Sequence, residues 1–367
     1  KQLGPAFLTF QGAESSRFTH SIGVFYIARR ALNKFLELDP SLIQFQGILY
    51  SAALLHDLGH GPLSHTGEEI FGLKHENWTA ILVRECPEIR KPLEAFQEGT
   101  ANLVANIFEK DQFSNSLIKS LVSSQLDCDR LDYLLRDSYN TGTRYGQLDL
   151  ERIISALTIA PDGNLAIHPK GLLAVEHYLV LRNLMFRSVY NHRINEICSW
   201  ILEKIIKIAR DLGPSKVWAD KYMSEWLWRI DEIDIDIFLA NDDIRTCYHL
   251  LKWKEEAPEI LSQLCKRFID RKLLKAIDIH HLSNECQLQA LAKARKLTEQ
   301  NGGEPDHLCT LRHQNLESYQ PYKKGLRLWD GRDLQALEKV SPLIEGLINP
   351  AIAAWLIHPK EIHEDLK

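Results

Sequence analysis

Apolar residues recur at helical spacing over most of this chain. Residues 21–38 place Ile22, Phe25, Tyr26 and Leu32 near one stripe, which predicts an amphipathic helix with that stripe toward the core. A second apolar run over 42–61 predicts a buried helix that ends near Gly59 and Gly61. The same periodicity predicts two further long helices, over 114–142 and 171–213.

Strand signals are few. Residues 157–168 and 325–338 each contain an Asp-Gly turn between short apolar runs, which predicts two β-hairpins. We therefore expect a mainly α fold with a helical core, small β-hairpins and an α+β C-terminal region. The segment 211–215 predicts a boundary between a core over 1–215 and a C-terminal part over 216–367.

Composition excludes some classes of protein. The 367 residues are 45% hydrophobic with a net charge of -5, which is ordinary for a water-soluble core and argues against binding dominated by nucleic-acid electrostatics. No apolar stretch approaches the roughly 20 residues that span a bilayer. The seven cysteines include no CxxC pair, so neither a zinc cage nor a disulfide framework is indicated, and a reducing cytoplasm is the expected compartment.

Histidine and aspartate residues gather at helix ends and supply the candidate chemistry. The string LLHDLGHGPLSH over 54–65 sets His56 beside Asp57, His20 lies near the start of the first helix, and Asp129 lies in DCDRLDYLLRD over 127–137. Imidazole and carboxylate together form a mixed N/O donor set for a divalent ion. A site of these four residues would join three helices and leave positions open for water and a phosphate oxygen, as metal-assisted hydrolysis requires.

The order and spacing of these strings resemble the HD-domain phosphohydrolases. KQLG, RFTHSIGV, HDLGHGPLSH, DCDRLDYLLRD and LRNLMFRSVYNHR are similar to motifs of the deoxynucleoside triphosphate (dNTP) triphosphohydrolases in that superfamily, densely over residues 1 to about 200. The resemblance implies one divalent ion per chain (Mn, Mg, Fe, Ni, Co or Zn) on His20, His56, Asp57 and Asp129. It favours Asp129 over its neighbours Asp127 and Asp132, which are expected to be structural.

The resemblance also implies a catalytic group and a substrate pocket. His60, Glu68 and His75 match a His–acid–His group that assists attack at the α-phosphate, although that acid is often Asp. Phe186 occupies a position at which some relatives carry a His. The residues implied to contact substrate phosphates, sugar or base are Gln2, Leu3, Arg17, His65, Arg130, Tyr133, Asp137, Arg182, Phe186 and Tyr190.

Helical spacing supports part of this pocket. Asp129, Tyr133 and Asp137 recur every four residues and share one helix face. Arg182 and Tyr190 share a face on another helix. Arginine suits bidentate phosphate contacts, and a tyrosine packed against C2′ would exclude a ribose hydroxyl.

The expected reaction is metal-dependent hydrolysis of a dNTP to a deoxynucleoside and inorganic triphosphate. Two alternatives stay open: an HD-type phosphodiesterase or nucleotidase acting on other nucleotides or single strands, and a nucleotide-sensing binding module. The resemblance further implies a homo-oligomer, dimer or tetramer, with a nucleotide effector near Lys170, His192 and Arg193. The basic stretch 265–275 is explained more simply by a solvated helix face, so nucleic acid is not the favoured partner.

Overall fold

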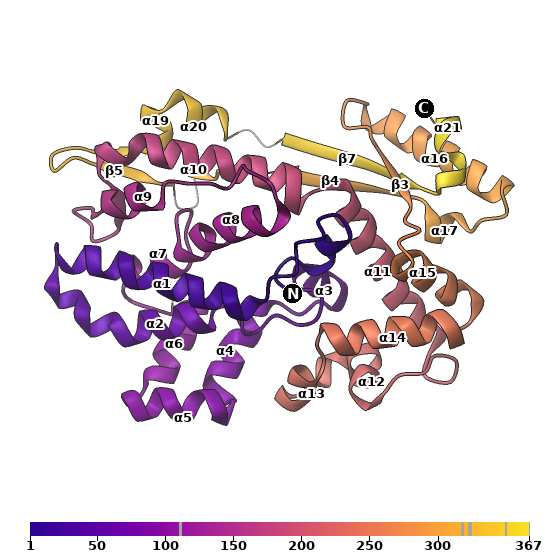
Figure 1. Cartoon of the computed structure of the whole chain (residues 1–367), viewed down its shortest axis with the longest axis horizontal. Helices are drawn as coiled ribbons and strands as arrows, with labels where there is room; N and C mark the ends of the chain where they lie inside the picture. Colours follow the sequence, from indigo (N-terminus) through magenta and orange to yellow (C-terminus); the bar gives the residue numbers. More distant parts are fainter. Residues whose placement is uncertain (110–111, 317–318, 322–324, 349–350, 367) are drawn as a thin grey trace.

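A computed structural model describes residues 1–109, 112–316, 319–321, 325–348 and 351–366. Helices dominate these residues, as Figure 1 shows, and the mainly α prediction is confirmed. The α-helices are α1 Arg17–Leu36, α2 Gln46–Leu55, α3 His65–Phe71, α4 His75–Glu85, α5 Pro87–Phe96, α6 Thr100–Phe108, α7 Ser116–Val122, α8 Cys128–Thr141, α9 Leu150–Ala156, α10 Leu172–Met185, α11 Arg193–Leu212, α12 Lys221–Trp228, α13 Ile235–Ala240, α14 Asp243–Glu256, α15 Glu259–Ile269, α16 Asn284–Gln300, α17 Pro305–Leu308, α19 Leu337–Val340, α20 Pro342–Gly346 and α21 His363–Leu366.

Helix α1 begins where Ser16 accepts a hydrogen bond from the backbone N–H of Thr19. Its predicted apolar stripe is only partly correct. Leu32 is buried, but Ile22 and Tyr26 are 46% and 50% exposed. The buried face of α1 carries His20, whose imidazole therefore points into the interior.

Both of the predicted long helices are interrupted, which corrects the sequence interpretation. The first divides into α7 and α8 because Asp127 caps α8, with its carboxylate accepting from the N–H groups of Ser124 and Arg130 at 2.9 and 2.7 Å. The second divides at a π-helical turn, Phe186–Tyr190, after which His192 caps α11. The predicted helix over 42–61 covers a 3-10 turn and α2, and it ends at Leu55, before His56.

Two small sheets accompany the helices. β1 (Leu157–Ile159) and β2 (Leu165–Ile167) form the first predicted hairpin, and β5 (Arg327–Trp329) and β6 (Leu334–Ala336) form the second. A parallel pairing of β2 with β5 joins both hairpins into one sheet. The strands β3 (Lys275–Asp278), β4 (Thr310–Leu316) and β7 (Ala351–His358) form an antiparallel sheet that the apolar pattern did not resolve.

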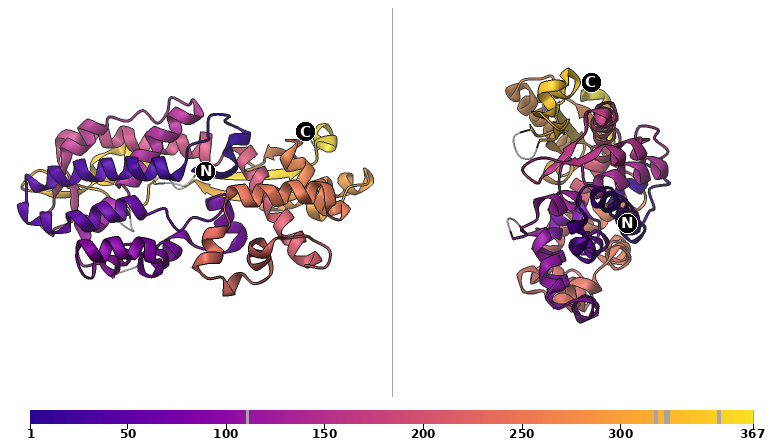
Figure 2. Two further views of the ribbon diagram at one scale, coloured as in Figure 1. Left: turned by 60° about the horizontal axis from the view of Figure 1, so that its bottom comes forward. Right: turned by 90° about the vertical axis from the view of Figure 1, so that its left-hand side faces the viewer.

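Buried apolar side chains form separate clusters along the long axis of the molecule. One lies among α1, α2, α6, α8 and α10 and includes Leu328 and Ile344 from the C-terminal part. Another joins α4 and α11 to α12, α14 and α15, and a third lies between α16 and the antiparallel sheet. Figure 2 shows α11 passing between the two ends of the molecule. The division at residue 215 stays a prediction.

Helix length and hydropathy decide whether a helix could cross a membrane. Within the described ranges, no helix combines the length and apolar character that crossing a bilayer needs.

Candidate metal centre and active site

Three of the four predicted metal ligands converge at the junction of α1, α2 and α8. The Nε2 atom of His20 lies 3.2 Å from Nε2 of His56 and 3.0 Å from a carboxylate oxygen of Asp129. Asp57, the fourth, places its carboxylate oxygens 3.6 Å from Nε2 of His20 and 3.5 Å from Nε2 of His56. Both imidazoles are buried. The four predicted residues therefore point at one another, as a shared cation requires.

Hydrogen bonds on the far side of each ring fix which nitrogen faces the centre. Nδ1 of His56 lies 2.9 Å from the carbonyl oxygen of Ala53, and Nδ1 of His20 lies 2.7 Å from a carboxylate oxygen of Asp132. Carbonyl and carboxylate oxygens only accept, so both Nδ1 atoms carry the proton. Each Nε2 therefore faces the centre, where it can bind a metal once it gives up its proton.

The local chain geometry holds His56 at this position. After α2 ends, the hydroxyl of Thr79 donates to the carbonyl oxygen of His56 at 3.1 Å and accepts from the N–H of Gly59 at 2.9 Å. A Cβ on Gly59 would lie 2.1 Å from the carbonyl oxygen of His75. Glycine is required there because the loop after α2 passes directly against the start of α4.

The charges of the centre are strongly coupled. Burial lowers the pKa of His20, but Asp129 and Asp132 outweigh it and raise that pKa to about 10. Burial raises the pKa of Asp129, yet hydrogen bonds from His20 and His56 hold it below its ordinary value. Arg17 forms an ion pair with Asp57. Such a donor set fits a divalent cation, since a metal charge can replace the protons that now balance these carboxylates.

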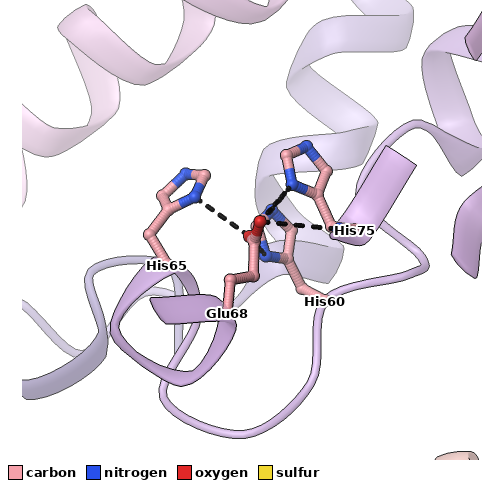
Figure 3. A group of neighbouring side chains, drawn as sticks. All are labelled: His60, His65, Glu68 and His75. Atoms are coloured by element: carbon pink, nitrogen blue, oxygen red, sulfur yellow. Dashed lines mark hydrogen bonds and ion pairs between the residues drawn. The ribbon is translucent and has the colours of Figure 1, made fainter. Parts of the chain in front are cut away.

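A second group surrounds Glu68 (Figure 3). Nδ1 of His60, His65 and His75 lies 2.8, 3.0 and 2.9 Å respectively from Oε1 of Glu68. Burial alone would raise the pKa of Glu68. Hydrogen bonds from the three imidazoles together outweigh burial and hold this pKa below its ordinary value. The predicted catalytic trio is thus brought together. His65, 73% exposed in its side chain, joins the trio from the first turn of α3.

The predicted phosphate-binding arginines lie on different elements. Arg130 follows Asp129 on α8, and its Nη1 lies 3.5 Å from Oδ2 of Asp127. Arg182 is buried on α10 and donates to Oε1 of Gln125 at 2.8 Å. Arg17 extends from the start of α1 to Asp57, as described above. Within the described ranges no hydrogen bond or ring contact joins these three cations to one another, although Arg130 and Arg182 both influence Tyr133 electrostatically.

The predicted sugar and base residues form an aromatic corner. Tyr190 donates to Asp137 at 3.0 Å, and its ring meets those of Tyr133 and Phe186 edge-on, with centroids 5.7 and 5.1 Å apart. Burial raises the pKa of Asp137 to about 7. Tyr190 ends the π-helical turn, a departure from α-helix geometry that is frequent at functional sites.

Gln2 and Leu3 approach this region from the N-terminal segment. The carbonyl oxygen of Gln2 accepts from Arg17 at 3.4 Å, which ties the segment to the metal-side arginine. Leu3 packs against the cluster of apolar residues around α1.

Unsatisfied polar atoms concentrate among these residues. Among the buried side-chain atoms of the described ranges, those without a hydrogen bond include atoms of Gln2, His60, Arg130, Asp137 and Arg182. Such atoms are rare in folded proteins and each carries a free-energy penalty. Their grouping marks a polar cluster whose hydrogen-bonding capacity is not fully used within the described chain.

The predicted effector residues are only partly adjacent. His192 caps α11, with Nδ1 accepting from the N–H of Ile194 at 3.3 Å, and Arg193 follows it. Lys170 lies in the 3-10 turn Pro169–Gly171, and no hydrogen bond in the described part of the chain joins it to His192 or Arg193. Arg193 lines a separate cavity of about 840 Å³.

Sequence reasoning missed two residues that position others. Asp132 was expected to be merely structural, yet it orients His20, and Arg136 holds it through two hydrogen bonds of 2.8 and 2.9 Å. Gln125 belongs to none of the candidate groups, yet it accepts a hydrogen bond from Arg182 and anchors it. The spacing of Asp132 and Arg136 at i and i+4 signalled an ion pair, but not its partner on α1.

Comparisons with known proteins agree with this geometry. A model of the HD domain matches residues 17–137, and a model of the HD associated region matches residues 148–358. The uncharacterized protein YwfO of Bacillus subtilis is 34% identical over 328 residues, which cover 89% of this chain and 74% of YwfO. The crystal structure of a phosphohydrolase from Bacteroides thetaiotaomicron superposes with a TM-score of 0.84 at 26% identity, covering 98% of this chain and 91% of that one.

More distant relatives include triphosphohydrolases. The deoxynucleoside triphosphate triphosphohydrolase SAMHD1 of Danio rerio is 27% identical over 247 residues, which cover 56% of this chain and 40% of that protein. The uncharacterized protein MJ1154 of Methanocaldococcus jannaschii is 34% identical over 209 residues, and the match spans 42% of its length. Together with the two family models, these similarities show that the chain belongs to the HD-domain phosphohydrolase superfamily.

Proposed function

We propose that this protein hydrolyses dNTPs to a deoxynucleoside and inorganic triphosphate. One observation carries the proposal: Arg130, Asp137 and Arg182 each have a buried polar atom without a hydrogen-bond partner. Arg130 and Asp137 lie on α8, which also carries the metal ligand Asp129, and Arg182 lies on α10. SAMHD1, a relative over half of this chain, is a triphosphohydrolase by name. One divalent ion per chain would be held by His20, His56, Asp57 and Asp129.

The bound ion would act as a Lewis acid toward a phosphate oxygen and lower the pKa of water. Arg17, Arg130 and Arg182 neutralise the phosphates of the substrate. Tyr133 packs under the deoxyribose, and Asp137 with Tyr190 hydrogen-bonds the 3′-hydroxyl. Gln2, Leu3, His65 and Phe186 complete the walls of the pocket. A Tyr ring against C2′ leaves no room for a ribose hydroxyl, which gives deoxy selectivity.

Hydrolysis proceeds at the α-phosphorus. The oxygen of a water molecule forms a bond to phosphorus as the bond from phosphorus to the 5′-oxygen breaks. The proton that the 5′-oxygen needs comes from His60 or His75, and Glu68 keeps these imidazoles oriented. The proton that the attacking water releases passes to solvent, and the imidazole is reprotonated from solvent. Triphosphate leaves with all three phosphorus atoms, and the nucleoside leaves intact.

Product analysis tests the reaction. The purified protein is incubated with each dNTP and NTP and with Mn, Mg, Fe, Ni, Co or Zn, and products are identified by mass. We expect nucleoside and triphosphate from dNTPs, little turnover of NTPs, and at least a 100-fold loss in Asp129→Ala. The exposed variant Asp211→Ala serves as the control. Diphosphate with monophosphate as products, or no dNTP turnover with any of these ions, would contradict the proposal.

The cavity beside Arg193 supports a nucleotide effector. Its lining is rich in cations, among them Arg193, Lys266, Arg271, Lys272 and Lys275. Clustered cations create a field that attracts phosphates. We expect a second dNTP to raise the turnover rate several-fold, and Lys272→Glu to abolish this activation. Rates indifferent to every added dNTP would contradict an effector, and filter binding of single strands would reveal a nucleic-acid ligand instead.

We also propose a homo-oligomer, dimer or tetramer, that works in the cytoplasm. The described cysteines are all free thiols, which suits a reducing compartment. Phe18 and Ile22, on α1, are exposed and recur one helical turn apart, as on a surface that meets a partner. Light scattering after size exclusion measures the mass, and a monomer at micromolar concentration would contradict the oligomer.

A further inference from the structure

Cations from distant parts of the sequence converge at the cavity beside Arg193. They come from the start of α11, the last turn of α15, the turn after α15, the start of β3 and the 3-10 turn Lys360–Ile362 that follows β7. The set includes Arg193, Arg267, Arg271, Lys272, Lys275 and Lys360. A solvated helix face would explain the basic stretch 265–275 taken alone, but it does not explain why positions 193 and 360 join it. The fold therefore builds this cluster.

Strand register and helix packing bring these positions together. Lys275 pairs with His358 across β3 and β7, so the chain leaves β7 beside Lys275 and reaches Lys360 directly afterwards. The helix α11 packs against α15 and β3, which sets Arg193 beside the same turn. A cavity of about 840 Å³ lies between these elements.

The cations of this cavity lack acidic partners. Among the described residues that line it, Glu361 is the one carboxylate, and no ion pair in the described part of the chain involves any of these cations. The neighbouring Asp270 pairs instead with Lys254 at 2.9 Å. Like charges held close together repel and raise the free energy of the folded chain. An anionic ligand of high charge would remove that repulsion.

The backbone of Arg271 supplies an independent observation. Its φ is 52°, in the left-handed region that favours glycine. Hydrogen bonds close the turn around it, because the N–H of Arg271 donates to the carbonyl oxygen of Phe268 at 3.2 Å and that of Asp270 to Lys266 at 2.9 Å. Residues other than glycine in this conformation cluster at ligand-binding sites. The cation that Arg271 adds to the cavity accounts for an arginine at this position.

The lining of the cavity favours phosphates over nucleobases. Among the described residues that line it, none is Phe, Tyr or Trp, the rings on which bases commonly stack. The imidazole of His363 already stacks on that of His358, with centroids 5.1 Å apart. Arginine and lysine side chains match phosphate oxygens. The start of α11 adds the positive end of a helix dipole at the same place.

We propose that this cavity binds a linear phosphate chain without reading a base, and that inorganic triphosphate occupies it as well as the tail of a nucleotide does. The inference rests on the proposed function in one respect, because hydrolysis of a dNTP is the reaction that supplies the triphosphate. Inorganic triphosphate makes the same contacts as the tail of a dNTP effector. The product therefore competes with the effector for these cations.

Titration calorimetry of the full, metal-free chain tests the site with inorganic triphosphate, each dNTP and deoxyadenosine. We expect triphosphate and all four dNTPs to bind with dissociation constants within about fivefold of one another, and deoxyadenosine not to bind. Lys272→Glu and Arg271→Gly should each weaken triphosphate binding roughly tenfold or more. Arg271→Gly should also raise the thermal midpoint, because glycine adopts a positive φ without strain. Lys207→Glu, the same charge change at an exposed position further along α11, should bind like the wild type.

Unchanged triphosphate binding in both Lys272→Glu and Arg271→Gly would overturn the proposal. A single dNTP that binds over tenfold more tightly than triphosphate would also overturn it, since the cavity would then read a base. The same holds if single-stranded oligothymidylate displaces triphosphate at an equal concentration of phosphate groups, because the ligand would then be a nucleic-acid strand. Asp129→Ala should bind triphosphate normally. A protein that hydrolyses no dNTP still gives these binding results, so the two proposals fail separately.

Discussion

At the residue scale, the metal centre depends on atoms that face away from it. Asp132 and the Ala53 carbonyl accept hydrogen bonds from Nδ1 of His20 and His56, so both Nε2 atoms already face inward before any ion arrives. A ligand fixed in its binding tautomer loses less freedom on binding than a rotating ring does. The partners behind the ligands therefore contribute to affinity.

Replacing Asp132 should weaken metal binding although it is not a ligand. We expect Asp132→Ala to lower the affinity for Mn²⁺ by roughly 10- to 100-fold, because His20 loses its orienting acceptor. Calorimetric titration of the metal-free protein measures this. Asp132→Asn, which keeps an acceptor oxygen, should recover part of the loss, and exposed Asp211→Asn should bind normally. Wild-type affinity in Asp132→Ala would contradict the orienting role.

Asp137 gives a pH dependence with a defined sign. Burial raises its pKa to about 7 in the folded state, against about 3.9 in an unfolded chain. At a pH between these two pKa values, Asp137 is protonated more often in the folded than in the unfolded protein. Ionisation of Asp137 therefore makes the free energy of unfolding fall as pH rises. Asp137→Asn cannot ionise and should lack this fall.

The test compares thermal midpoints of the metal-free proteins at pH 5 and pH 8. Between pH 5 and pH 8, we expect the free energy of unfolding of Asp137→Asn to increase by roughly 1–3 kcal/mol relative to that of the wild type. The range follows because one pKa unit corresponds to about 1.4 kcal/mol. Equal pH dependence in the two proteins would contradict the raised pKa. Asp211→Asn again controls for the loss of a surface charge.

How much of the site the sequence predicts depends on the kind of contact. His20, His56, Asp57 and Asp129 were foreseeable because their residue types and spacing match a known motif. Asp132 was not, because its role depends on a contact with a residue 112 positions away. His65 joins Glu68 because Leu63 and Ser64 adopt positive φ, which no residue type there signals.

At the scale of elements, helix boundaries are set by caps that periodicity does not report. The apolar pattern continues across Asp127 and across His192, yet both side chains accept backbone N–H groups and begin new helices. The π-helical turn before His192 shifts Tyr190 toward Asp137. The strand β7, with the sequence AIAAWLIH, lacks the alternation by which half-buried strands are recognised.

Close packing between α1 and α8 leads to a prediction at Gly23. A Cβ there would lie 1.8 Å from Oδ1 of Asp132 and 2.4 Å from Nη2 of Arg136. Gly23→Ala should displace this pair, lower stability by roughly 1–3 kcal/mol and weaken metal binding through His20. Chemical denaturation and metal titration measure the two effects. Asn33→Ala, exposed on the same helix, should be neutral or slightly stabilising, and a Gly23→Ala protein that binds metal normally would contradict the coupling.

At the scale of the whole molecule, one arginine joins the antiparallel sheet to α3 and α11. Arg312 on β4 lies 2.8 Å from Glu69 on α3 and 3.3 and 3.4 Å from Glu196 and Glu203 on α11. Burial raises the pKa of Glu196, and Arg312 opposes that rise. Glu69 adjoins Glu68, so this network positions the helix that carries the second group.

Removing this cation should destabilise the protein. Arg312→Met leaves three carboxylates facing one another, and we expect a loss of roughly 2–4 kcal/mol near neutral pH. The loss should be smaller at pH 5, where Glu196 can take up a proton instead. Arg327→Met, whose exposed partner is Asp162, should cost under about 1 kcal/mol. Denaturation at both pH values checks this, and equal losses in the two variants would contradict the network.

The parallel pairing of β2 with β5 bears on how the chain can be divided. Ile167 and Leu328 sit side by side in one sheet although 160 intervening positions separate them. A fragment that ends after residue 215 would keep all four proposed metal ligands and the group around Glu68. It would also expose the edge of β2 and the apolar surface that Leu328 and Ile344 now cover. Because exposed strand edges and apolar surfaces promote association, we expect this fragment to aggregate.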